Sequence, residues 1–432
     1  MARQHLLRAA EVAIQNPFRD GDWATACQRL LAEGVAAPLG DAVRRGDTTL
    51  AKRLVLALGV AQAAAGVEPK KLLDDHALPA RLAKELPRPR GAYVRVAAAA
   101  GRATRALGAL RGRSAAMQRV RRDTWAACFG ESLYHALVLE AVVRDHDVLI
   151  LGETGTGKET VAEAIVTGTP GDATGSPCPR AALNAAAVPD TLIESELFGH
   201  VRGAFTGAQG SRAGRIRSAA DGCFFLDEIG DLTDTAQAKL LRVMETDEVT
   251  PLGSDKAERA DVRYVAATHQ DLAAMVDAGS FRRDLYQRLA GNVIELPPLR
   301  ERPEDIVDIG LAFVTRYVGA EADTLGLGGL RQWLESAQVR GYPWPGNVRE
   351  LQNALRNTML GLPTALRSDA SPSMSTPLPP ALVEGSWPLS QVESWYIERA
   401  VARSDGNLSE AARVLGVDRS TLARRLRRKS AS

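Results

Sequence analysis

The chain has 432 residues, and its 54 lysine and arginine residues nearly balance 52 aspartate and glutamate residues, giving a formal net charge of +2. Charged residues make up 25% and hydrophobic residues 45% of the sequence, which excludes a collagen-like or a wholly disordered protein. The length predicts about three domains, and a chain of this size needs no disulfide or metal ion to support its core.

Neither a membrane-spanning segment nor a secretory signal is predicted. The longest stretch without a charge, Leu54 to Val67, is shorter than the roughly 18 residues that a spanning helix requires. Arg3, Arg8 and Glu11 interrupt any apolar segment at the N-terminus. The four cysteines have no CxxC spacing and do not cluster with histidine. We therefore expect a cytoplasmic protein whose thiols are reduced.

Residues 1–108 are rich in Ala, Leu and Arg and show helical periodicity, as in Leu50 to Ala65. A receiver domain would place acidic residues at strand ends, whereas Asp74 and Asp75 follow a helical Lys70-Lys-Leu-Leu segment. No metal cluster or nucleotide motif is present in this part of the sequence. We expect an α-helical regulatory or interaction region, without a signature for its ligand.

From residue 109 onward, short β-branched runs alternate with amphipathic helices, which is typical of a parallel sheet with crossover helices. The runs are Asp147 to Leu151, Cys223 to Leu226 and Val262 to Ala267. Residues 363–389 contain six prolines and several serines, which indicates a linker before a last domain at 390–432.

The first run ends at the glycine-rich loop Gly152-Glu-Thr-Gly-Thr-Gly-Lys158-Glu159. A strand, a glycine-rich loop and a helix in this order place backbone N–H groups around phosphates, with Lys158 as the counter-charge. Glu159 stands where the general motif has the hydroxyl ligand of Mg²⁺, and Thr160 comes one residue later. The residues expected to hold the nucleotide are Gly152, Glu153, Thr154, Gly155, Thr156, Gly157, Lys158, Glu159 and Thr160.

The second run, Cys223-Phe-Phe-Leu-Asp227-Glu228, is an apolar strand that ends in two acids. In this arrangement Asp227 is expected to hold Mg²⁺ and Glu228 to polarise the attacking water. A buried strand that ends in solvated acids is common, but here it follows a phosphate-binding loop in the same α/β region. Together the two elements predict hydrolysis of a nucleoside triphosphate, with ATP and Mg²⁺ as cofactors.

The C-terminal segment is predicted to form a helix over 390–403 and then a helix, a turn at Gly416 and a second helix. Residues 406–432 contain seven basic and two acidic residues, which favours contact with DNA phosphates. A basic, solvated terminal helix is the alternative. The residues expected to contact DNA are Arg419, Ser420, Thr421, Arg424, Arg425 and Arg428.

The hexapeptide Gly203-Ala-Phe205-Thr206-Gly-Ala208 lies between the two nucleotide motifs. With it, the chain resembles the bacterial enhancer-binding proteins, the AAA+ activators of sigma-54 RNA polymerase, over 109–362 and, through a Fis-type helix-turn-helix, over 390–430. The resemblance implies an α/β fold, with an AAA+ P-loop subdomain at 109–285 and a helical lid at 286–362. It also implies that the contact loop for sigma-54 consists of Gly203, Ala204, Phe205, Thr206, Gly207 and Ala208.

Further residue roles follow from the same resemblance. Asn184 resembles the switch asparagine that pairs with the catalytic glutamate, here Glu228, and Thr268 resembles the tip of the sensor I strand. Arg282 and Arg288 stand at the arginine-finger positions, where a permanently charged fork can neutralise a γ-phosphate in a neighbouring subunit. Arg349 resembles the sensor II arginine. His269 stands where many relatives have asparagine, and the segment from Cys128 to Tyr134 resembles an insertion.

These features predict an ATP-hydrolysing, DNA-binding activator that remodels the sigma-54 RNA polymerase holoenzyme. It is expected to bind double-stranded DNA at an upstream site and to form a hexameric ring, with a dimer as an inactive form. Two alternatives remain at this point: an AAA+ remodeller of another protein, and a DNA-binding repressor with a vestigial motor.

Overall fold

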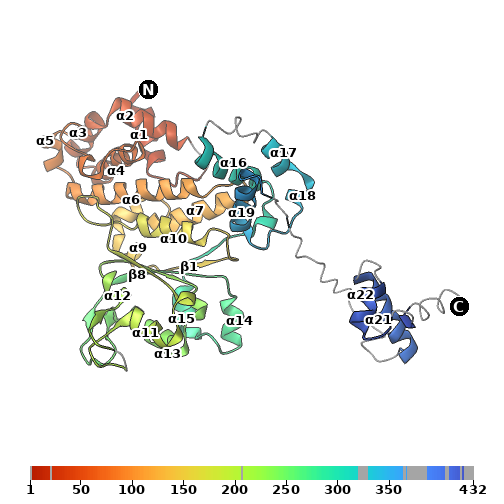
Figure 1. Ribbon diagram of the computed structural model, residues 1–432. Helices are drawn as coiled ribbons and strands as arrows, with labels where there is room; N and C mark the ends of the chain where they lie inside the picture. The colour runs from red at the N-terminus through yellow and green to blue at the C-terminus, as the bar shows by residue number, and fades with distance from the viewer. Residues whose placement is uncertain are drawn as a thin grey trace. The chain divides into compact units, whose positions relative to one another are not determined.

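The computed structural model describes residues 2–19, 22–205, 208–319, 329–362, 366, 387–403, 408–418 and 421–422. The chain divides into two compact units, Met1–Thr364 and Ala365–Ser432. The first unit contains a group of N-terminal helices, a parallel sheet with helices on both faces, and a helical lid (Figure 1).

The N-terminal part of the first unit is helical, as predicted. Its described residues form α-helices and one short 3₁₀ turn, η1, and contain no strand. Asp47 caps the longest of the first four helices by accepting a hydrogen bond from the Leu50 N–H group at 2.9 Å. The elements are α1 (Ala2–Ala13), α2 (Trp23–Glu33), α3 (Ala36–Arg44), α4 (Thr48–Ala64), η1 (Pro69–Lys71), α5 (Ala80–Lys84) and α6 (Arg90–Ala109).

The central sheet has five strands in the order β2-β5-β8-β1-β9, and every neighbouring pair is parallel. β1 (Val148–Leu151), β5 (Gly222–Asp227) and β8 (Val262–Thr268) are the three predicted strands. β2 (Arg180–Asn184) and β9 (Val293–Glu295) lie at the two edges, where fewer apolar side chains are needed. The parallel α/β architecture that the sequence predicted is therefore confirmed.

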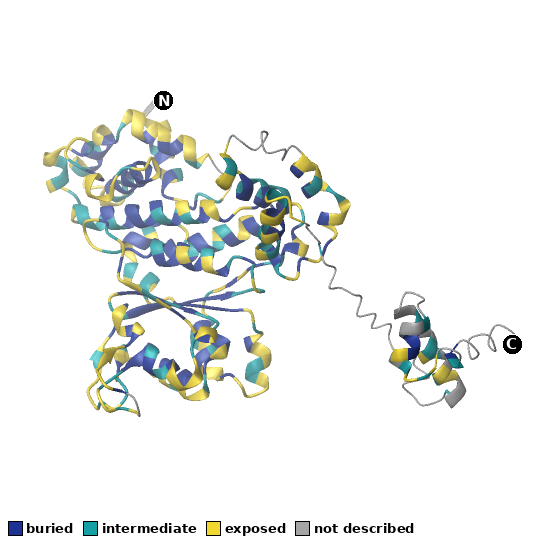
Figure 2. Cartoon of the chain, in the orientation of Figure 1, coloured by how far each residue is buried: buried dark blue, intermediate teal, exposed yellow. Residues whose placement is uncertain are grey.

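Successive strand residues point to opposite faces of the sheet and enter two separate cores. Val148 and Ile150 belong to the core that contains α10, whereas Leu149 belongs to the core on the other face. Helices cover both faces of the sheet, whose strands are largely buried (Figures 1 and 2). The first group of helices comprises α7 (Ala115–Phe129), α8 (Leu133–Val138), α9 (Glu140–Arg144) and α10 (Lys158–Gly168). The second comprises α11 (Asp190–Phe198), α12 (Arg215–Ser218), α13 (Asp234–Thr246), α14 (Leu272–Asp277) and α15 (Arg283–Leu289).

Helix α10 packs between the sheet and α6, so the N-terminal helices and the sheet share one core. The two helices approach closely at Gly168, where a Cβ atom would lie 2.9 Å from Cys128 Sγ and 3.0 Å from Ala103 Cβ. Arg102 of α6 donates hydrogen bonds to the carbonyl oxygens of Thr167, at 2.9 Å, and Gly175, at 2.8 Å. These contacts fix the C-terminal end of α10 against α6.

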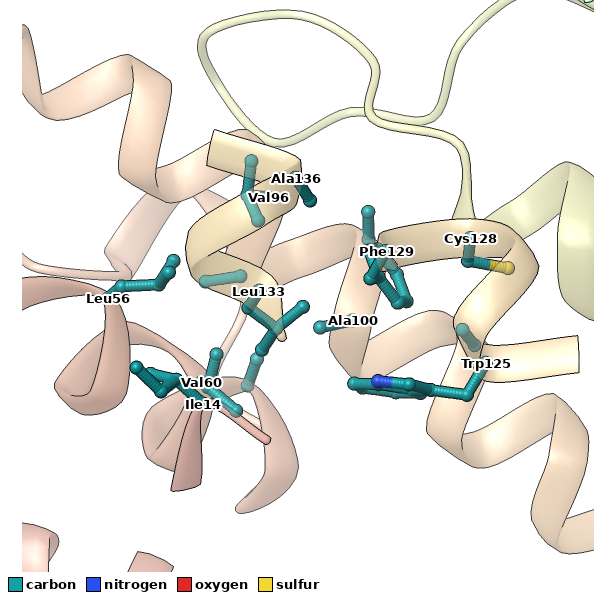
Figure 3. Packing of buried hydrophobic residues seen from close by; sticks show 14 of the residues in the cluster. Ile14, Leu56, Val60, Val96, Ala100, Trp125, Cys128, Phe129, Leu133 and Ala136 are labelled. Atoms are coloured by element: carbon teal, nitrogen blue, oxygen red, sulfur yellow. The ribbon is translucent and has the colours of Figure 1, made fainter. Parts of the chain in front are cut away.

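The segment from Cys128 to Tyr134, which resembles an insertion, joins the N-terminal helices to the sheet. Phe129 and Leu133 lie in the buried cluster that also contains Ile14 and Leu56 (Figure 3). The Leu133 N–H group donates to the Ile14 carbonyl oxygen at 2.8 Å, and residues 15 and 132 form an isolated antiparallel bridge. The segment therefore has a structural function, which is to attach α1 to the end of α7.

The remaining elements form two small hairpins, the lid and the C-terminal unit. The hairpins are β3 (Gly199–His200) with β4 (Arg212–Ala213), and β6 (Glu248–Val249) with β7 (Glu258–Arg259). The lid consists of α16 (Asp305–Val318), α17 (Leu330–Glu335), α18 (Ala337–Arg340) and α19 (Asn347–Met359). Three short 3₁₀ turns lie among the described residues after α6: η2 (Ala185–Ala187), η3 (Ile229–Asp231) and η4 (Leu299–Glu301). The second unit contains α21 (Leu389–Arg403) and α22 (Leu408–Leu415). Within the described ranges, no helix is long and apolar enough to cross a membrane.

Removal of residues 1–108 should prevent the α/β region from folding stably. The deletion exposes the face of α10 that carries Val161 and Ile165, and each such side chain contributes about 1.5–3 kcal/mol when buried. We expect a chain starting at residue 109 to be insoluble or to lose cooperative thermal unfolding. A chain that ends at residue 364 is the control, and it should keep the melting temperature of the first unit. A soluble chain from residue 109 with an unchanged melting temperature would contradict the shared core.

Candidate active site

The glycine-rich loop joins the end of β1 to the start of α10, so the first N–H groups of the helix point into the site. Gly155 and Gly157 have φ values of +81° and +115°, which residues with a side chain rarely adopt. A Cβ atom at Gly155 would lie 2.4 Å from the carbonyl oxygen of Gly346 in the lid. Glycine is therefore required at this position both for its conformation and for the approach of the lid.

Lys158 is the first residue of α10, and its side chain is buried at the edge of the sheet. Its Nζ atom donates to the Gly152 carbonyl oxygen at 2.8 Å and lies 3.8 Å from Glu228 Oε1. Burial lowers the pKa of Lys158, while the charges of Glu228 and Asp227 oppose this effect. The sequence had predicted a cation beside an acid pair, and the fold brings these three side chains together.

Asp227 ends β5 and pairs directly with Asn184, the last residue of β2. Asn184 Nδ2 donates to Asp227 Oδ2 at 2.8 Å. Pairing of Asn184 with Glu228 was expected from the family resemblance, and in this structure the asparagine contacts Asp227 instead. The strand register places Asn184 opposite Asp227, whereas Glu228 has a φ of +52° and turns away from β2. Burial, followed by the charge of Glu228, raises the pKa of Asp227.

Glu228 is held by the tip of β8. Its Oε2 atom accepts one hydrogen bond from the His269 N–H group at 3.1 Å and lies 2.8 Å from His269 Nδ1. Burial acts to raise the pKa of Glu228, but the His269 hydrogen bonds and the charge of Lys158 prevail and lower it. Thr268 is buried, and its hydroxyl accepts a hydrogen bond from the Gln270 N–H group at 3.0 Å. The structure thus gives His269 a direct contact with the carboxylate that the sequence predicted to polarise water.

A polar clamp, defined here as Glu153, Arg300 and Asn347, joins the glycine-rich loop to the lid. Arg300 donates two hydrogen bonds to the Glu153 carboxylate, at 2.8 and 2.5 Å. Asn347 Nδ2 donates to Glu153 Oε2 and to the Thr154 carbonyl oxygen, both at 3.1 Å. The hydrogen bonds from Arg300 hold the pKa of Glu153 below its usual range. Arg300 and Asn347 were not predicted, because their partner is distant in the sequence and no local pattern marks the contact.

A cavity of about 850 Å³ opens between the glycine-rich loop and the lid. Its lining includes Leu110, which follows α6, Thr160 of α10, Arg302, which follows η4, and Phe313 and Val348 of the lid helices. A volume of this size suits a small-molecule ligand. Thr160 faces this cavity, whereas Glu159 is exposed to solvent.

Arg349 lies on α19 beside the glycine-rich loop. Its Cβ atom is 3.1 Å from the position that a Cβ atom at Gly155 would take, and its charge acts to lower the pKa of Lys158. The position predicted for a sensor II arginine is therefore adjacent to the phosphate-binding loop.

The two predicted finger arginines lie on or next to α15, and Arg288 lies at the amino end of β1, opposite the phosphate-binding loop. Arg288 Nη2 lies 3.4 Å from carboxylate oxygens of both Asp145 and Asp147, which precede β1, whereas the glycine-rich loop follows β1. Burial raises the pKa of Asp147 to about 6, against the effect of the Tyr264 N–H group and of Arg288. Arg282 is paired with Asp284 at 2.7 Å.

The hexapeptide 203–208 extends from the hairpin of β3 and β4. The Gly203 N–H group donates to the Ala208 carbonyl oxygen at 3.0 Å, and Ala204 is only partly exposed. Phe205 keeps 38% of its surface exposed and is one of the exposed large hydrophobic side chains among the described residues. Thr206 and Gly207 lie outside the described residues.

The C-terminal unit has the predicted helix, turn and helix start. Ala411, Ala412 and Leu422 are buried together, and Gly416 makes the turn with a φ of +66°. Thr421 lies at the start of the second helix and is partly exposed. The other residues predicted to contact DNA lie outside the described residues: Arg419, Ser420, Arg424, Arg425 and Arg428.

Three known families match successive parts of this chain. Residues 132–295 match the family described as "Sigma-54 interaction domain", and residues 300–366 match "AAA+ ATPase lid domain". Residues 388–428 match "Bacterial regulatory protein, Fis family".

Several curated proteins are similar over the same region. "Transcriptional regulatory protein ZraR" of Escherichia coli (strain K12) is 43% identical over 284 residues, which are 65% of this chain and 63% of ZraR. The protein of the same name from Salmonella typhimurium is 41% identical over 302 residues, 69% of this chain and 67% of the relative. "Alginate biosynthesis transcriptional regulatory protein AlgB" of Pseudomonas aeruginosa is 40% identical over 303 residues, 66% of this chain and 63% of AlgB. The chain thus spans slightly less than two thirds of the length of the first of these relatives.

Replacement of Arg300 by alanine should weaken nucleotide binding by about fivefold, because a partly exposed double hydrogen bond between the lid and the loop is lost. Isothermal titration with ADP measures the dissociation constant. Arg331→Ala is the matched control, since Arg331 is an exposed lid arginine paired with Glu335 at 3.5 Å and lies outside the clamp. Equal affinities of the two variants would show that the clamp does not support the site.

Proposed function

Because the chain belongs to the family of sigma-54-dependent transcriptional activators, we propose that it is an ATP-hydrolysing, DNA-binding activator that remodels the sigma-54 RNA polymerase holoenzyme to open promoters. The observation that carries the proposal is the convergence of Lys158, Asp227 and Glu228 at the carboxyl ends of the central strands, beside the lid. These are the three charges that binding and hydrolysis of a nucleoside triphosphate require.

ATP would occupy the cavity between the glycine-rich loop and the lid. The N–H groups at the start of α10 and the ammonium group of Lys158 would bind its phosphates. Arg349 would approach the same phosphates from the lid. Glu228, which is ionised because His269 and Lys158 stabilise its carboxylate, would accept a proton from the attacking water.

The acid pair suits a magnesium ion shared with the nucleotide. Burial and the adjacent Glu228 raise the pKa of Asp227, so a divalent cation at this carboxylate would relieve an unfavourable charge. Within the described part of the chain, no three His, Cys, Asp or Glu residues are grouped to bind a metal ion. Mg²⁺ typically binds one or two carboxylates and completes its shell with phosphate oxygens and water. Asp227 would hold the ion, which would neutralise phosphate charge.

Arg282 and Arg288 would serve the site of a neighbouring copy. In their own chain Arg288 lies at the opposite end of β1 from the phosphate-binding loop. An arginine at that edge can complete a site only if copies of the chain pack side by side, which supports a ring, proposed to be a hexamer. A dimer is proposed as an inactive form.

The other parts of the chain have proposed roles in the same process. Residues 203–208, from Gly203 to Ala208, would contact sigma-54, and the helix-turn-helix at 390–432 would bind double-stranded DNA in the cytoplasm. Residues 1–108 would regulate the α/β subdomain, which comprises residues 109–285. The lid at 286–362 and a linker at 363–389 follow that subdomain in the chain. The core shared by α6 and α10 supports direct regulation of the phosphate-binding helix.

The main test is transcription by purified sigma-54 holoenzyme with the full chain, with and without ATP. Glu228→Gln should still bind ATP but lower the hydrolysis rate by at least about 100-fold, and it should not activate transcription. Unchanged hydrolysis by this variant would contradict the assignment of Glu228. Normal hydrolysis by the wild-type chain with no effect on transcription would favour a remodeller of another protein.

His269→Ala should lower the kcat of ATP hydrolysis by about tenfold, since Glu228 loses its side-chain hydrogen bond from β8. KM should change little, because His269 does not contact the phosphate-binding loop among the described interactions. His269→Asn is the matched variant: its amide can occupy the place of Nδ1, and we expect it to keep most of the activity. A steady-state ATPase assay measures both constants, and an alanine variant with a normal kcat would remove His269 from the mechanism.

A further inference from the structure

The base of the loop 203–208 is held by backbone hydrogen bonds to two neighbouring segments. β3 pairs antiparallel with β4, with His200 opposite Arg212. Leu252 of the neighbouring loop adds a third segment, because its N–H group donates to the Gly199 carbonyl oxygen at 2.9 Å and its carbonyl oxygen accepts from Val201 at 3.0 Å. The backbone at His200 is therefore held firmly below the tip of the loop.

The side chain of His200 connects the loop to a helix. Its Nδ1 atom lies 2.8 Å from the hydroxyl oxygen of Ser195, a buried residue of α11. Its ring lies 5.1 Å, centroid to centroid, from the ring of Phe205, at an interplanar angle of 67°. This is the edge-to-face arrangement that aromatic rings prefer. One imidazole thus contacts both α11 and the exposed aromatic residue of the loop.

Helix α11 also leads back to the acid pair. It follows β2 after one short turn, η2, and β2 ends at Asn184, whose amide bonds Asp227. A displacement of the end of β2 would therefore act on α11, and Ser195 lies on that helix, one turn before its C-terminal end.

We infer that His200 is a positioning residue that docks Phe205 against the base of the loop, and that movement of α11 through Ser195 releases the ring. The structure shows the docked arrangement of the two rings. Release would present the phenyl ring to an apolar partner surface. The identity of that partner, sigma-54, rests on the proposed function, whereas the docking contact itself does not.

Chymotrypsin cleavage after Phe205 tests the docking contact in the full-length chain without any partner. Loss of the ring pair and its anchoring hydrogen bond should shift the equilibrium toward the released ring by about tenfold, and His200→Ala should be cleaved there about tenfold faster than wild type. His200→Asn, which can still bond Ser195 but has no aromatic ring, should behave like the alanine variant. Ser195→Ala keeps the ring without its anchor and should give a smaller increase.

Cleavage after the exposed Tyr317 is the internal reference, and fragment masses identify each cut. ATP hydrolysis should be unchanged in all three variants, which separates release of the loop from general unfolding. Equal cleavage rates after Phe205 in the wild type and in the histidine variants would overturn the inference. If His200→Ala does not fold, the rate for Ser195→Ala decides in the same way.

Binding of fluorescently labelled sigma-54 by the full chain tests the consequence. We expect His200→Ala to bind it about tenfold more tightly than wild type in the absence of nucleotide, since the ring is already released. If His200→Ala and wild type bind sigma-54 with equal affinity, while ADP with aluminium fluoride still increases the affinity of wild type, only the role of His200 is overturned. A wild-type chain that binds sigma-54 in no nucleotide state would instead overturn the proposed function and, with it, this consequence.

Discussion

The packing of α10 between the sheet and α6 is the constraint on which the rest of the first unit depends. The phosphate-binding loop has little structure of its own, and the direction of its N–H groups is set by the helix that follows it. Alanine and glycine residues at the contact let α6 approach closely, as at Gly168 and Ala103, and Arg102 binds the Thr167 carbonyl oxygen in the last turn of α10. A phosphate site built in this way is rigid on one side, while its other side is the lid. The N-terminal helices therefore belong to the framework of the site and not only to its control.

At the opposite end of α10, charge governs the arrangement. Lys158, Asp227 and Glu228 are all partly or fully buried. The two carboxylates favour the charged form of Lys158, and Lys158 favours theirs, whereas the charge of Glu228 disfavours ionisation of Asp227. Burial works against all three charged forms. Of the two carboxylates, only Glu228 has a lowered pKa, which favours its ionised form, because His269 donates hydrogen bonds to it. Two adjacent carboxylates thus acquire different properties from their neighbours. A bound cation would stabilise the charge of Asp227, whereas Glu228 is held in its charged form by its neighbours.

The sequence predicted the elements that have strong local patterns and missed those that depend on distant partners. Three apolar strands, the glycine-rich loop and the acid pair were predicted correctly because each is marked by a local pattern: an apolar run, closely spaced glycines, or two acids at the end of an apolar run. The edge strands β2 and β9 are short or carry few apolar residues, so periodicity did not reveal them. The partner of Asn184 depends on strand register, and the clamp between Glu153 and Arg300 joins residues on different subdomains; neither can be inferred from spacing. The structural function of the segment from Cys128 to Tyr134 depends on its contact with the residues after α1, which are distant in the sequence.

Because the strands are parallel, the phosphate site and Arg288 lie at opposite ends of the sheet. The carboxyl ends of β1, β5 and β8 carry the lysine, the acids and His269, whereas the aspartates that bind Arg288 precede β1. Because β1 is only four residues long, both ends are rigidly linked, yet Arg288 cannot reach the phosphate site of its own chain. The loop with Phe205 is linked to the same carboxyl edge through β2, α11 and His200. An event at the phosphates would therefore reach the loop within one chain, and in the proposed ring Arg288 would make that event depend on a neighbouring copy.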